Sequence, residues 1–251
     1  MTSLIHQSSY VSKKVNLGKN VKIGPFCNID GNILIDDNTE LKSHISITGN
    51  TTIGKNNTFY PFSNIGCDPQ DIKFKGEDSF LSIGNSNIFR ENTTISKGTE
   101  DGGMKTKIGN KNLFMTGVHV AHDCNIGNEN ILVNQVTLGG HVNIVNNVVI
   151  GGLSAVIQFV TIGSYSMIGG MSGIDKNVLP FSLVIGNRAK LRGLNLVGIR
   201  RNNFSKNNIL RISEIHKLFI KDKIELNLED RVDLIFNDYK SILNEKLGHI
   251  Q

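Results

Sequence analysis

The chain has 251 residues, 39% of them hydrophobic and 20% charged, a composition that excludes disordered, fibrous and collagen-like proteins. Its formal net charge is +5, and no run of apolar residues reaches the roughly 18 that a membrane-spanning helix needs. The N-terminal residues also lack the pattern of a secretory signal peptide.

The three cysteines, Cys27, Cys67 and Cys124, lie far apart in the sequence and show no metal-ligand spacing. An odd number of scattered cysteines is typical of proteins that stay in a reducing compartment. We therefore expect a cytoplasmic protein with no membrane span.

A hydrophobic residue returns at every sixth position and is often followed by glycine. None of these positions is polar: Val11, Leu17, Ile23, Ile29, Ile35, Leu41, Ile47, Ile53, Phe59, Ile65, Ile83, Phe89, Ile95, Ile108, Phe114, Val120, Ile126, Leu132, Leu138, Ile144, Ile150, Val156, Ile162, Ile168 and Ile174. Because alternate residues of a strand face the same side, each hexapeptide turns this residue and the small one two before it inward. A period of six excludes an α-helix, whose inward stripe recurs about every 3.6 residues. It predicts an all-β domain of short strands stacked as a parallel β-helix, with three hexapeptides in each coil.

The β-helix is expected to span residues 1–185. By resemblance to hexapeptide-repeat proteins, its coil should be left-handed. The repeat is interrupted at 67–82 and at 97–107, and both segments are expected to leave the coil as loops. Loops that project from a rigid scaffold often carry binding residues, although tolerated insertion is the alternative.

Two histidines follow the second interruption, in the stretch GVHVAHDC. Residues separated by three hexapeptides should stack about 4.8 Å from each other, the spacing between strands. His122, Gly140 and Gln158 therefore form one column at a single edge of the prism, with His119 and His141 beside it. A histidine suits a general base, and an exposed glycine N–H suits an oxyanion donor for acyl transfer.

Three questions about this column stay open. Asp123 could orient the His122 ring, as a carboxylate does in catalytic triads, but the sequence does not show whether it reaches the ring. His119, His122 and His141 could instead hold zinc, as histidines do in the gamma-class carbonic anhydrases, although their spacing is unlike that class. They could also be solvated surface residues. The general base is the interpretation that we favour, with no metal.

Residues 186–251 are expected to form a small α-helical domain, with helices around 205–220 and 228–247 that Ser205 and Asn227 would cap. This segment holds 13 Lys and Arg against 8 Asp and Glu, whereas the preceding residues hold 14 of each. A local basic surface favours an anionic partner. Nucleic acid is disfavoured, because the chain has no Trp and no interleaving of basic and aromatic residues.

Four stretches carry a more specific resemblance: GVHVAHDCNIGNENILVNQVTLGGHV, IGGLSAVIQFVTIG, MIGGMSG and LNLVGIRRNNFS. They resemble the acyl-carrier-protein-dependent UDP-N-acetylglucosamine O-acyltransferases of lipid A biosynthesis over nearly the whole chain. The resemblance implies a homotrimer that transfers an (R)-3-hydroxyacyl group from acyl carrier protein to the sugar 3-hydroxyl. It implies no cofactor, because the carrier-protein thioester is itself the donor. The acidic carrier protein would suit the basic tail.

The same resemblance implies roles for individual residues. His122 would be the general base, with Asp123 beside it, and Gly140 would supply the oxyanion donor. The residues expected to contact the sugar nucleotide are His119, His141, Gln158, Gln70, Asp71, Lys73, Asn195 and Arg201. Gly170 would lie where the family measures acyl length, and a glycine there would leave room for a longer chain.

The chain departs from better-known members of the family at four positions. Ser96, Ile157 and Arg188 stand where a histidine is common, and Val197 stands where a glutamate is common. None is the expected base, but they leave open whether the acceptor carries a 3-hydroxyl or a 3-amino group. Three rival functions are the N-acyltransferase of the same pathway, a coenzyme A-dependent sugar N-acetyltransferase and a non-catalytic assembly subunit.

Overall fold

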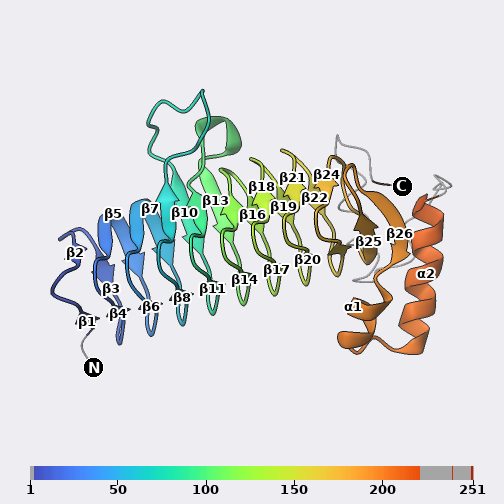
Figure 1. Ribbon diagram of the computed structural model, residues 1–251, viewed down its shortest axis with the longest axis horizontal. Coiled ribbons are helices and arrows are strands. Elements are labelled where there is room, and N and C mark those ends of the chain that lie inside the picture. The colour runs from blue at the N-terminus through green and yellow to red at the C-terminus, as the bar shows by residue number, and fades with distance from the viewer. Residues whose placement is uncertain (1–2, 221–238, 240–249, 251) are drawn as a thin grey trace.

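The computed structural model describes residues 3–220 together with Tyr239 and Ile250. The strands form an elongated prism with the N-terminus at one end and helices at the other (Figure 1). The predicted fold class, a left-handed parallel β-helix followed by a small helical part, is confirmed. The expected helix around 228–247 lies outside the described residues. None of the helices that are described is long and apolar enough to cross a membrane.

The prism has three faces of parallel strands. The first face contains β1 (Leu4–Ile5), β4 (Lys22–Ile23), β6 (Glu40–Leu41), β8 (Thr58–Phe59), β11 (Ile88–Phe89), β14 (Leu113–Phe114), β17 (Ile131–Leu132), β20 (Val149–Ile150), β23 (Met167–Ile168) and β25 (Ser182–Ile185). The second contains β2 (Tyr10–Val11), β9 (Asn64–Cys67), β12 (Thr94–Ser96), β15 (His119–Val120), β18 (Thr137–Leu138), β21 (Ala155–Val156) and β24 (Gly173–Ile174). The third contains β3 (Asn16–Leu17), β10 (Phe80–Ile83), β13 (Lys105–Ile108), β16 (Asn125–Ile126), β19 (Asn143–Ile144) and β22 (Thr161–Ile162).

Two longer strands, β5 (Asn28–Ile35) and β7 (Ser46–Ile53), bend from the second face onto the third. The bend lies at Gly31, whose φ of 143° is open to glycine. A Cβ added there would also lie 2.3 Å from the Gly49 carbonyl oxygen of the next coil. These two strands join two faces of the prism into one continuous sheet.

The predicted register of three hexapeptides per coil is confirmed in the paired strands. Lys22 pairs with Glu40, and Lys107 pairs with Asn125. Every repeat position from Ile23 to Ile174 is buried in one hydrophobic cluster, as the hexapeptide pattern predicts. The coil also begins one hexapeptide earlier than the repeat indicated, because β1 pairs with β4.

Both interruptions leave the coil, and they project side by side from one edge (Figure 1). Their bounds are narrower than predicted, because β9 runs to Cys67 and β10 begins at Phe80, which leaves residues 68–79 as the first excursion. The second excursion is 97–104 and contains the short 3₁₀ helix η1 (Glu100–Gly102). Strand pairing resumes on each side of both excursions.

A column of aromatic rings restores the register across the excursions. Ile88 pairs with Thr58 and Leu113 pairs with Ile88, so both coils that carry an excursion contain more residues than a regular coil. Inside the prism, Phe89 stacks on Phe59 at 4.6 Å between ring centroids and on Phe114 at 4.8 Å. Because stacked aromatic rings prefer a defined offset, this column helps to align successive coils where the number of residues per coil changes.

The β-structure continues past the expected boundary at residue 185. A strand that the repeat does not predict, β26 (Lys190–Leu194), pairs with β25 in antiparallel register. A short helix, α1 (Leu196–Arg201), follows it, and then α2 (Lys206–Ile220). The N-cap expected at Ser205 is confirmed, because the Ser205 hydroxyl accepts a hydrogen bond from the Asn208 N–H at 3.2 Å. Helix α2 places Ile212 in a second buried cluster with Phe181 and Ile199.

One inner corner of the prism is lined by stacked asparagines. Asn112 is buried, and its amide donates to the Asn87 side-chain oxygen at 3.0 Å and to the Gly127 carbonyl at 2.9 Å. Its own side-chain oxygen accepts the Asn130 N–H at 2.9 Å. Each amide thus satisfies backbone groups of its own coil and of the neighbouring coils, which water cannot reach.

Replacing Asn112 by alanine should therefore leave buried backbone groups without a hydrogen-bond partner. We expect Asn112→Ala to lower the free energy of unfolding by about 2–4 kcal/mol, measured in urea. The control is Asn125→Ala, because Asn125 is exposed and its amide donates only to Asn143 at 2.9 Å. That variant should change the stability by less than about 0.5 kcal/mol. Equal losses in the two variants would contradict the structural role of the inner asparagines.

Candidate active site

The two histidines of the predicted column lie where the prism turns from its second face to its third. His122 and Asp123 form the turn between β15 and β16, and His141 lies one coil above. Asp123 and His141 both adopt left-handed backbone conformations, with φ values of 58° and 61°. The His141 N–H donates to the His122 carbonyl at 3.0 Å, which fixes one turn directly on the other.

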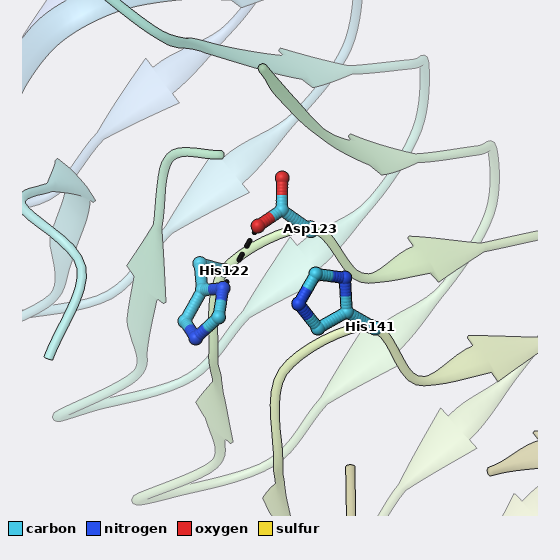
Figure 2. Close-up of side chains that lie close together, drawn as sticks. All are labelled: His122, Asp123 and His141. Atoms are coloured by element: carbon cyan, nitrogen blue, oxygen red, sulfur yellow. Dashed lines mark hydrogen bonds and ion pairs between the residues drawn. The ribbon is translucent and has the colours of Figure 1, made fainter. Parts of the chain in front are cut away.

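His122 is buried rather than solvated, with 5% of its surface exposed. Its Nδ1 lies 2.8 Å from Oδ2 of Asp123, and Figure 2 shows this contact with His141 beside it. Because a carboxylate only accepts hydrogen bonds, Nδ1 carries the hydrogen and Nε2 keeps its lone pair. Asp123 therefore makes the contact that it would need to orient the His122 ring.

Gly140 lies against the other side of the imidazole. A Cβ added at Gly140 would lie 2.6 Å from Cε1 of His122 and 2.7 Å from Nε2. No side chain fits there, so the backbone of Gly140 is the group next to Nε2. Within the part of the chain that the structure describes, the Gly140 N–H donates no hydrogen bond. Gln158, the third member of the predicted column, is exposed one coil further, where its N atom would lie 2.9 Å from a Cβ added at Gly139.

The two neighbouring histidines are half-buried. The His141 ring meets the His122 ring edge-on at 5.2 Å and stacks on Phe159 at 4.4 Å. His119 is hydrogen-bonded at Nδ1 to the Thr94 hydroxyl at 2.7 Å. Burial lowers the pKa of both imidazoles, and at His141 the negative charge of Asp123 opposes part of this effect.

The first excursion brings Asp71 to the open side of the base. Its Oδ2 lies 4.0 Å from Nε2 of His122, too far for a hydrogen bond. Lys73 contacts Asp101 of the second excursion at 3.7 Å, so the two excursions meet. A cleft of about 230 Å³ lies between them, and Gln70 is exposed close by in the chain.

Three of the expected site residues lie in the last coils and the helical part. Asn195 is the N-cap of α1: its side-chain oxygen accepts the Gly198 N–H at 3.0 Å, and its amide donates to the Tyr165 carbonyl at 2.9 Å. Arg201 ends α1 with its side chain exposed. Gly170 is exposed above Gly152, whose carbonyl oxygen would lie 3.3 Å from a Cβ added at Gly170. No contact of these three with His122 occurs among residues 3–220.

The four positions that depart from the family pattern differ in their surroundings. Ser96 is buried, with its hydroxyl 3.7 Å from the Cys67 sulfur. Ile157 and Val197 are exposed apolar side chains, and Arg188 is an exposed cation. Ser96 lies beside His119 in the neighbouring strand β12, and Ile157 directly follows β21 of the same face.

Two residues near the base were not expected from the sequence. Phe159 lies one coil, or three hexapeptides, after His141, so the same spacing that defines the column could have found it. Thr99 donates to the Asp123 carboxylate through both its N–H and its hydroxyl. No spacing rule could have found Thr99, because it lies in an excursion, where the register is lost.

A metal would have to use His122, Asp123 and His141, whose ligand atoms lie within 4.8 Å of one another. His119 does not belong to this group, so the three-histidine zinc site considered from the sequence is not assembled within the described chain. The Asp123 carboxylate already holds the His122 Nδ1 and the Thr99 donors. The contacts of Asp123 therefore fit a carboxylate that orients His122 better than one that binds a metal ion.

Comparisons with known proteins agree with this geometry. A family model described as domain 2 of UDP-N-acetylglucosamine O-acyltransferase matches residues 177–248. An acyl-[acyl-carrier-protein]–UDP-N-acetylglucosamine O-acyltransferase of Thermodesulfovibrio yellowstonii is 46% identical over 222 residues, which cover 88% of this chain and 86% of the relative. The enzyme of the same name from Rickettsia canadensis is 46% identical over 240 residues, or 95% of this chain and 90% of the relative.

A crystal structure of the Moraxella catarrhalis UDP-N-acetylglucosamine O-acyltransferase is similar with a TM-score of 0.93 and 40% identity, covering 98% of this chain and 99% of that one. The similarity thus extends over the coil, both excursions and the C-terminal part. On this shared sequence and fold, the chain belongs to the family of UDP-N-acetylglucosamine O-acyltransferases and is an acyltransferase.

Proposed function

We propose that the protein transfers an (R)-3-hydroxyacyl group from acyl carrier protein to the 3-hydroxyl of UDP-N-acetylglucosamine, the first step of lipid A biosynthesis. The observation that carries this proposal is the state of His122. Its Nδ1 hydrogen is held by Asp123 at 2.8 Å, and its Nε2 is free to accept a proton beside the Gly140 backbone. The names of the relatives supply the substrates.

In this reaction Nε2 of His122 takes the proton of the sugar hydroxyl as the oxygen attacks the thioester carbonyl. The carbonyl oxygen becomes an oxyanion, which the unused N–H of Gly140 would stabilise. The intermediate then expels the thiolate of the carrier protein, and the imidazolium returns its proton to that sulfur. Asp123 keeps the ring oriented and stabilises its transient charge. No metal, cofactor or acyl-enzyme takes part in this scheme.

The other expected residues are proposed to bind the substrates. Asp71 and Lys73 sit on the excursion that borders Nε2, where they would contact the sugar together with Gln70. His119, His141 and Gln158 would line the same site from the coil. Arg201 is proposed to bind the diphosphate, because a guanidinium forms paired hydrogen bonds with phosphate oxygens.

The exposed Gly170 is proposed to leave space for the acyl chain. Asn195 is proposed to contact the nucleotide together with Arg201, from the N-terminus of α1 that its side-chain oxygen caps. We further propose a homotrimer, which the stacked and exposed Leu153 and Met171 support as apolar surface available for burial. The three unpaired cysteines support a cytoplasmic location.

Exposed cations near the C-terminal end support docking of an acidic carrier protein. They are Arg188, Lys190, Arg192, Arg200 and Arg201. Long-range attraction to an anionic partner raises the rate of encounter and weakens with added salt. An acidic carrier protein is therefore a suitable partner for this surface.

The test of the proposed function is an acyl-transfer assay with UDP-N-acetylglucosamine and a panel of 3-hydroxyacyl carrier proteins. We expect His122→Ala to lower kcat by more than about 100-fold, because a general base supplies that much. His6→Ala is the control, since His6 is exposed and directly follows β1, the first strand of the prism. Wild-type turnover that survives in His122→Ala would contradict the assignment of the base. Turnover only with a 3-amino sugar acceptor would replace the proposed acceptor.

The lowered pKa of His119 gives a prediction for stability. In the unfolded chain a histidine takes up its proton near pH 6.5, whereas burial holds the pKa of the folded His119 below that value. As the pH falls below about 6.5 the unfolded state binds the proton first, so stability is lost. We expect His119→Gln to lose less unfolding free energy than wild type between pH 7.5 and 5.5, measured in urea. His6→Gln is the control and should follow wild type; a His119→Gln variant that did the same would contradict this account.

A further inference from the structure

The carboxylate beside the base is held mainly by a residue from outside the coil. The Thr99 N–H lies 2.9 Å from Oδ1 of Asp123 and 3.1 Å from Oδ2, and the Thr99 hydroxyl donates to Oδ2 at 2.6 Å. We propose that Thr99 is a positioning residue, which fixes Asp123 so that Asp123 can hold His122 in its reactive orientation. This inference rests on the proposed function of His122 as general base.

Burial makes the donors of Thr99 necessary. The Asp123 side chain is 0% exposed, so water cannot satisfy its oxygens. A buried carboxylate is tolerated only when hydrogen bonds replace its hydration. Among the described residues, the one other donor to this carboxylate is the Nδ1–H of His122. Without the Thr99 hydroxyl, Oδ2 would keep only the longer contact with the Thr99 N–H at 3.1 Å and the contact with the ring that it orients.

The conformation of Thr99 indicates that this contact is not a by-product of local structure. Thr99 occupies the N-cap position of η1, where a threonine hydroxyl ordinarily accepts an N–H of its own helix. Here it makes no such cap, and its hydroxyl is directed to Asp123 instead. The Thr99 carbonyl accepts the Met104 N–H at 2.8 Å, which closes the excursion into a compact turn. The Thr99 hydroxyl is thus bonded to the Asp123 carboxylate and not to the backbone of its own turn.

The same turn presses closely on the carboxylate through Gly102. A Cβ added at Gly102 would lie 1.9 Å from Cγ of Asp123, so no other residue fits without moving the carboxylate. Thr99 is itself 4% exposed. The second excursion therefore covers Asp123, excludes water from it and supplies its donors. In this way the second excursion, which interrupts the repeat, supports the general base through Asp123.

The first variant is Thr99→Val, which has nearly the same shape and removes only the hydroxyl donor. We expect kcat to fall about 10- to 100-fold, as for other residues that act by orienting a reactive group, with KM within about twofold of wild type. Thr99→Ser restores the hydroxyl and should recover most of the lost kcat. The split between kcat and KM distinguishes loss of orientation from loss of substrate binding.

The matched control is Thr93→Val. Thr93 is also buried, and its hydroxyl donates to the Arg90 carbonyl at 2.7 Å, away from the base. Its kcat should stay within about twofold of wild type. Thermal unfolding at the assay pH confirms that each variant is folded where kcat is measured. A Thr99→Val variant with the kcat of Thr93→Val would overturn the proposal, as would a Thr99→Ser variant as impaired as Thr99→Val.

Two further variants test the route through Asp123. Gly102→Ala should lower kcat in the same way, because its methyl group would displace the carboxylate. In an Asp123→Ala background, Thr99→Val should cause no further loss, since the two residues act as a unit. Additive losses would contradict the proposal. Full activity in His122→Ala would instead contradict the function proposed above. Loss of activity in His122→Ala together with full activity in Thr99→Val would contradict only the role of Thr99.

Discussion

The parallel backbone ladder between successive coils is the constraint on which the rest of this protein depends. Each strand is hydrogen-bonded to the strand one coil away, so a residue has a fixed neighbour in the next coil. His122 and Gly140 meet for this reason, and so do His141 and Phe159. The ladder alone aligns these two pairs of residues. Its geometry is as stiff as the coil that the buried apolar repeat holds together.

That regularity explains why much of the site could be predicted from sequence alone. The hexapeptide repeat sets the strands, and counting whole coils from His122 finds Gly140 and then Gln158. The contact of Asp123 with the ring could be suggested but not established, because it depends on the rotation of two side chains. The burial of His122 could not be predicted either. This turn residue is covered by Gly140 and His141 of the next coil, and Asp71 approaches it from the first excursion.

Counting residues failed where the chain leaves the repeat. Thr99 reaches Asp123 from a segment without periodicity, and Asp71, which lies near His122, was expected only from the family resemblance. The strand β26 and the helix α1 were missed for the same reason. Asn195 illustrates a different limit: the resemblance makes it a substrate contact, and the sequence did not show that its side-chain oxygen also caps α1. A residue shared with a family can keep its place for a structural reason.

The two carboxylates near His122 lie beside different nitrogen atoms of its ring. Asp123 lies 2.8 Å from Nδ1 and is fixed, whereas Asp71 lies 4.0 Å from Nε2 on an excursion. A sugar hydroxyl that donates its one hydrogen to Nε2 has none left for Asp71. An amine carries enough hydrogens to reach both. Because the fixed column presents the same Nε2 to an alcohol or to an amine, Asp71 is the carboxylate near His122 whose position can distinguish the two acceptors.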